Sequence, residues 1–159
     1  MLFKAMHIIH LLTVIVWIGG LAFVTILALP MAIRMRDPLQ KVLFFQRIEH
    51  KFAPMARIYN LIVGITGFGM IFMAGWHKAL LTRQGIPLLF MLVVWVFWFV
   101  MLFGLEPFIV KKMLDKMARS GGKMEIEAVF ARMNRMHWVL LVVSLAASAA
   151  GLIFAHGYI

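Results

Sequence analysis

The sequence predicts an all-α integral membrane protein in which four transmembrane helices form one bundle. Hydrophobic residues make up 64% of the 159 residues and charged residues 14%, whereas a soluble domain is about 45–50% apolar and about 25% charged. Four apolar runs are each close to the roughly 20 residues that a helix needs to cross a bilayer. We therefore expect residues 1–159 to form a single membrane domain.

The four helices are expected at about residues 6–29, 53–75, 87–105 and 137–155, with boundary errors of about two to four residues. Pro30 should end the first helix, because proline does not easily continue one. Pro54 falls near the start of the second helix and Pro87 opens the third, where a missing N–H group costs least. Residues 124–136 show helical periodicity and should run directly into the fourth helix.

The first connection, residues 31–51, is amphipathic, which leaves open whether it extends the helices or lies on the membrane interface. Lysine and arginine are concentrated in this connection and in the one before the fourth helix. They are Arg34, Arg36, Lys41, Arg47 and Lys51 in the first, and Lys111, Lys112, Lys116, Arg119, Lys123, Arg132 and Arg135 in the other. The positive-inside rule places both connections in the cytoplasm.

The expected orientation is therefore N-out and C-out, in a multi-pass protein of the bacterial inner membrane. The net charge of +10 would suggest nucleic acid in a soluble protein, but here it reflects topology and contact with membrane lipid headgroups, so no nucleic acid is expected. The chain has no cysteine, which excludes disulfides, iron–sulfur clusters and covalently attached haem. No Asp or Glu falls inside the predicted spans except Glu106, at the end of the third, and no nucleotide motif is present, which argues against a hydrolase or an ATP-driven pump.

The six histidines are the candidate functional residues, because an ionisable side chain in a bilayer is expensive. Topology sorts them into an outer level, His7, His10, His77 and His156, and a cytoplasmic level, His50 and His137. His50 and His77 are 27 positions apart, which is about 40 Å on a continuous helix. The two levels therefore cannot share one site.

Haem b held between facing helices is the simplest use of such a layout, since its iron takes an imidazole from each side. We expect one or two haems. The candidate ligands are His7 or His10 with His77 for an outer haem, and His50 with His137 for a cytoplasmic one. Arg57 follows His50 by seven positions on the same helix face, and should bind a propionate.

Such a cytochrome would carry electrons across or at the membrane, with a quinone or a periplasmic redox protein as its partner. A stripe of small residues in the fourth helix permits a homodimer without requiring one. The alternative is a copper-handling permease with His7, His10 and His77 at its outer mouth, since imidazole suits copper. His7, His77, His50 and His137 are thus the candidate metal ligands under these hypotheses. His156 lies one residue from the end of its apolar run, and a place among the headgroups explains it.

Several short segments resemble a known family. Residues 4–9 (KAMHII) and 16–23 (VWIGGLAF) resemble the first helix of the copper-resistance protein D superfamily, which includes the HemJ-type membrane protoporphyrinogen oxidases. Residues 47–52 (RIEHKF), followed by Thr66 and Gly67, resemble their second-helix entry, and residues 75–80 (GWHKAL) resemble a Gly-Trp-x-His-Ala-Lys stretch of the HemJ type.

The resemblance implies a compact four-helix bundle that binds b-type haem, with His7 as one ligand and His77 or Lys78 as a second. It also implies a third possible function, the oxidation of protoporphyrinogen IX; an enzyme of this kind would be a haem-dependent membrane oxidoreductase. The chain departs from the oxidases in the order around His77 and Lys78, in a longer segment before the third helix, and in two additional histidines, His50 and His137.

Overall fold

The computed structural model describes residues 1–105 and 123–157, and within these ranges the chain is helical without any strand. Glu106, the predicted turn at residues 120–122 and the cations Lys111, Lys112, Lys116 and Arg119 lie outside the described residues. Within the described ranges, four helical segments are long and apolar enough to cross a membrane: Leu2–Arg34, Pro38–Met73, Arg83–Gly104 and Ile126–His156. The prediction of an all-helical, multi-pass membrane protein is thereby confirmed.

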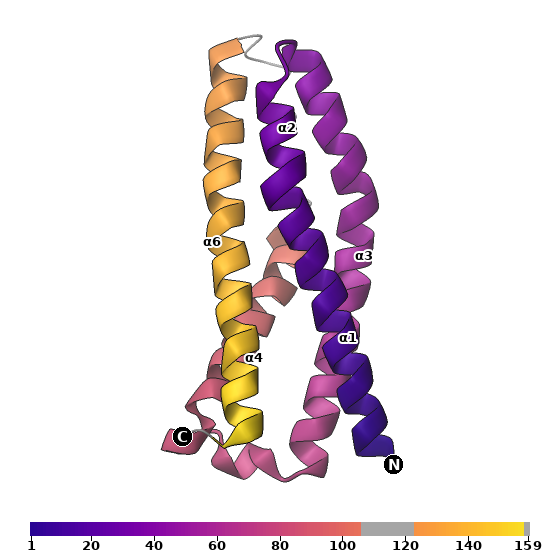
Figure 1. Cartoon of the computed structure of the whole chain (residues 1–159), viewed down its shortest axis with the longest axis vertical. Coiled ribbons are helices and arrows are strands. Elements are labelled where there is room, and N and C mark those ends of the chain that lie inside the picture. The colour runs from indigo at the N-terminus through magenta and orange to yellow at the C-terminus, as the bar shows by residue number, and fades with distance from the viewer. Residues whose placement is uncertain (106–122, 158–159) are drawn as a thin grey trace.

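Both chain termini lie at one end of the bundle, which we call the terminal end (Figure 1). It contains the start of α1 (Leu2–Phe23), the end of α6 (Lys123–His156) and the short helix η2 (Trp76–Ala79). The opposite end, the loop end, contains the connection between α2 (Leu29–Arg34) and α3 (Pro38–Met73) and the start of α6. The helix α4 (Ile86–Val100) lies in the half nearer the terminal end.

The first span does not end at Pro30, contrary to the prediction. Helix α1 passes into a π-helical turn, η1 (Val24–Ala28), and then into α2, which ends at Arg34. A π-turn holds one more residue than an α-turn. The wider turn just before Pro30 makes room for the proline ring, which would otherwise clash with a carbonyl of the preceding turn. The helix ends instead at Met35, whose backbone is extended (ψ 133°).

The second helix begins 15 positions before its predicted start at residue 53, at Pro38. The carboxylate of Asp37 accepts a hydrogen bond from the Leu39 N–H group at 3.0 Å, and Pro38 takes the first helical position. Both are typical helix-start features. The 36 residues of α3 span about 54 Å, against about 30 Å for the hydrocarbon core of a bilayer. The basic connection therefore extends the helix, and Pro54 lies in its interior.

The last two spans agree better with the prediction. Pro87 lies in the first turn of α4, which passes into a second π-helix, η4 (Met101–Leu105). Helix α6 runs without a break from Lys123 to His156, so the segment 124–136 does continue into the fourth span.

Two apolar clusters hold the helices together. In the first, Trp17 of α1 meets Trp98 of α4 edge to face at 5.5 Å, and the Trp98 Nε1–H group donates to the Ser144 hydroxyl of α6 at 3.0 Å. In the second, at the loop end, Phe45 meets Phe130 edge to face at 5.8 Å. The indole N–H groups that are buried in such a core need acceptors, and Ser144 supplies one.

Candidate functional site

His10 is the histidine most firmly fixed at the terminal end. Its half-buried imidazole faces α3, with Nδ1 2.9 Å from the Thr66 hydroxyl oxygen. That hydroxyl lies 2.6 Å from the Ile62 carbonyl oxygen and donates its one proton there. Thr66 therefore accepts a hydrogen bond from the Nδ1–H group of His10. This arrangement fixes the tautomer and leaves the lone pair on Nε2 available for a ligand.

Gly67 provides the space in which the His10 ring lies. A Cβ atom at Gly67 would come within 3.2 Å of His10 Cε1, closer than an ordinary van der Waals contact. The dipeptide Thr66–Gly67 thus supplies both the acceptor and the clearance for one imidazole on the facing helix. A close approach of this kind is the usual reason for glycine between membrane helices.

His7 lies one turn before His10 and is exposed. Its ring is tilted against Phe3 at 6.4 Å, and Phe3 in turn meets Trp76 of η2 edge to face at 5.7 Å. Trp76 also meets Phe154, near the end of α6, edge to face at 5.0 Å. Aromatic contacts therefore join α1, η2 and α6 around the terminal end, and His7 lies at the margin of this group.

His77 follows Trp76 in η2 and is exposed, with its ring 5.8 Å from that of Phe72 in α3. His156 is also exposed, and its Nδ1 lies 2.9 Å from the Leu152 carbonyl oxygen of its own helix. The four histidines assigned to the outer level thus lie at the same end of the bundle, on three different elements. Within the ranges that the structure describes, no group of three or more His, Cys, Asp or Glu side chains is placed to hold a metal ion.

At the loop end, the two histidines face different surroundings. The Nδ1–H group of His137 donates to the Met133 carbonyl at 3.0 Å, so its Nε2 also keeps a lone pair, whereas His50 is exposed on α3. His137 lines a cavity that His50 does not reach. Arg57 donates from Nε to the Leu102 carbonyl at 2.9 Å and so links α3 to η4. The roles predicted for His50 and Arg57 toward a haem stay predictions.

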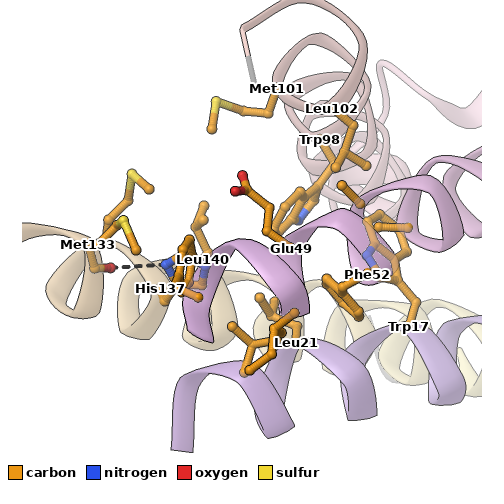
Figure 2. A pocket seen from close by; sticks show the side chains of 16 residues that line it. Trp17, Leu21, Glu49, Phe52, Trp98, Met101, Leu102, Met133, His137 and Leu140 are labelled. Carbon is orange, nitrogen blue, oxygen red and sulfur yellow. Dashed lines mark hydrogen bonds between the residues drawn. The ribbon is translucent and has the colours of Figure 1, made fainter. Parts of the chain in front are cut away.

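The cavity beside His137 lies between α1, α3, the α4–η4 junction and α6, and has a volume of about 140 Å³. Figure 2 shows the Glu49 carboxylate reaching into the open space, with His137 on the α6 side. The remaining walls are apolar and aromatic: Trp17, Leu21, Val24, Phe45, Ile48, Phe52, Ala53, Ala56, Trp98, Met101, Leu102, Met133, Met136 and Leu140. Among the described residues that line it, Glu49 and His137 are therefore the only ionisable ones.

Sequence reasoning missed Glu49, although it singled out its neighbour His50. Consecutive residues on a helix point about 100° apart, so a shift by one position separates a surface residue from a cavity residue. The available signal was the spacing of Glu49, Ala53, Ala56 and Asn60, at steps of four, three and four along one face of α3.

The cavity beside His137, of about 140 Å³, is smaller than the roughly 300–1,000 Å³ of typical cofactor and small-molecule sites, and the haem predicted between His50 and His137 stays a prediction. At the terminal end, His10 has the hydrogen-bonded Nδ1 that is typical of a metal-ligating histidine, and Gly67 leaves room for its ring.

Asn60 lies on α3 between these two ends and is fully buried. Its backbone carbonyl accepts a hydrogen bond from Trp95 Nε1–H at 3.0 Å, but its side-chain Oδ1 and Nδ2 have no partner. A buried polar group without a partner costs about 1–3 kcal/mol. The apolar middle of the bundle therefore contains one uncompensated amide between the two histidine levels.

The comparisons with known proteins leave the family open. No family model matches the chain, and no curated protein or solved structure matches it either. The likeness to the copper-resistance protein D superfamily therefore stays an expectation from the short segments around His7, Thr66 and His77.

Proposed function

We propose that this chain is a membrane b-type cytochrome-like protein that binds haem at its terminal end through His10. The observation that supports this most is the hydrogen bond from His10 Nδ1–H to Thr66. A metal-ligating histidine almost always donates its second ring N–H group to an oxygen, which orients the ring and makes Nε2 more basic. Haem between helices of a bundle is held by such imidazoles, and supplies a one-electron couple when bound.

His77 is the second residue that would hold the haem. The Phe3–Trp76 contact ties η2, which carries His77, to the first turn of α1. Lys4 and Lys78 are exposed at the same end and provide cations for the haem propionates. The family resemblance favours His7 over His10 as the α1 ligand, and the two assignments predict different variants to lose haem.

The proposed activity is electron transfer with a quinone or a periplasmic redox protein. A reduced-minus-oxidised spectrum of the purified protein should show the sharp α-band of six-coordinate haem b, with about one haem per chain. Copper without haem would favour the permease alternative instead. Rescue of a haem-auxotrophic strain would assign the chain to the porphyrinogen oxidases. Absence of any haem band after expression with sufficient haem would overturn the proposal.

We also propose that the terminal end faces the periplasm, in line with the lysine and arginine counts. The chain has no cysteine, so single cysteines report sidedness directly. Thr82 follows η2 at the terminal end, and Arg36 lies between α2 and α3; both are exposed. In spheroplasts, an impermeant maleimide should label Thr82→Cys at once and Arg36→Cys only after lysis. The reverse order of labelling would contradict this orientation.

A further inference from the structure

We infer that the loop-end cavity beside His137 binds the ring of a quinone or quinol. The inference deepens the proposed function by naming the electron donor and its site, and its redox step rests on that function. Binding of the quinone ring is independent of that function, because it depends only on the residues that line the cavity.

The size of the cavity fits one ring. Its volume is about 140 Å³, and an apolar protein cavity of about 150 Å³ is known to bind benzene. Trp17, Phe52 and Trp98 supply aromatic walls, against which a planar ring packs favourably. Met101 and Met133 add flexible, polarisable side chains that adapt to ring substituents.

The polar groups of the cavity distinguish a quinol from a plain hydrocarbon. A hydrocarbon ring would offer no hydrogen bond to the Glu49 carboxylate or to the His137 Nε2 atom, both of which line the cavity. A quinol carries two hydroxyl groups on opposite sides of its ring, and these can donate to the two acceptors on α3 and α6. Met136 lines the cavity and is also exposed on the bundle surface. The cavity is partly open to the surface, so an isoprenoid tail can pass from it into the lipid.

The same cavity is lined in part by α1, the helix that carries His10. Trp17 and Trp98 both line it and contact each other at 5.5 Å. Trp17 follows His10 by seven residues on α1, two turns or about 10 Å along the axis. Oxidation of one quinol releases two electrons and two protons. Glu49 and His137 Nε2 would accept the protons, and the haems proposed for two protein molecules, one in each, would take one electron apiece.

The test is equilibrium binding of duroquinone to the detergent-purified full chain, followed by quenching of tryptophan fluorescence. Ala53 is buried and lines the cavity, so Ala53→Phe should fill it and weaken binding at least tenfold. Ile58 on the same helix is 56% exposed and faces away from the cavity, so Ile58→Phe should bind like the wild type. Duroquinol binding should also weaken severalfold in Glu49→Gln and His137→Gln, which add no volume.

Absence of saturable binding, or equal weakening by Ile58→Phe and Ala53→Phe, would overturn the inference. If Ala53→Phe fails to fold, the variants Glu49→Gln and His137→Gln decide, and unchanged duroquinol affinity in both would refute the site. The proposed function fails separately. If the protein is free of haem but binds duroquinone with this variant pattern, the cavity assignment holds and the haem assignment fails. If the protein contains haem but shows no saturable duroquinone binding, the haem assignment holds and the cavity assignment fails.

Discussion

His10→Ala should remove haem from the purified protein, lowering its content from about one per chain to below about a tenth. Substituting a residue that only supports a metal ligand typically costs about 10–100-fold in affinity, and removal of the ligand itself should exceed that. The measurement is the pyridine haemochrome content per chain, with helicity by circular dichroism as a check on folding. Thr66→Val, which removes the acceptor of the His10 Nδ1–H bond, should weaken haem retention less.

Two matched variants make this result specific. His156→Ala removes an exposed imidazole at the same end, one that is bonded within its own helix, and should keep its haem. His7→Ala should also retain haem if His10 is the ligand. Loss of haem in His7→Ala together with retention in His10→Ala would support the family resemblance and contradict the assignment of His10.

The lengths of the helices show what hydropathy predicts and what it misses. Apolar runs predicted all four spans, because a bilayer demands apolar side chains over a fixed length. The start of α3 was placed too late, since its first turns carry charges and lie beyond the apolar run. Asp37 and Pro38 already formed a helix-start signal in the sequence. The prediction that Pro30 ends the first helix is wrong for a different reason. The π-turn that accommodates this proline has no signal of its own in the sequence.

The candidate site was predictable in its residue types and only partly in its geometry. Histidines stood out because ionisable groups in a membrane are rare, and their grouping at two ends follows from helix direction alone. Which side chain faces inward depends on the rotation of each helix about its own axis. For this reason Glu49 lines the cavity and its neighbour His50 does not. The partnership of His10 with Thr66 depends on the relative height of α1 and α3, which only packing determines.

Gly67→Leu should abolish haem binding, because the new side chain would occupy the space of the His10 ring. A smaller side chain at this position should have a smaller effect. The Cβ atom of Gly67→Ala would lie 3.2 Å from His10 Cε1. A small displacement relieves that contact, so Gly67→Ala should retain most of its haem. Leucine has a higher helix propensity than glycine, so a loss of haem in Gly67→Leu cannot come from weaker helix propensity.

Gly19→Leu is the matched control for this prediction. Gly19 lies on α1, and a Cβ there would meet nothing within 4 Å, so this variant should bind haem like the wild type. Haem content and thermal unfolding are measured for all three variants in the same detergent. Wild-type haem content in Gly67→Leu would mean that the His10 imidazole is not held against α3 in the loaded protein. The assignment of His10 would then fail, since the contact with Thr66 and Gly67 is the geometry on which it rests.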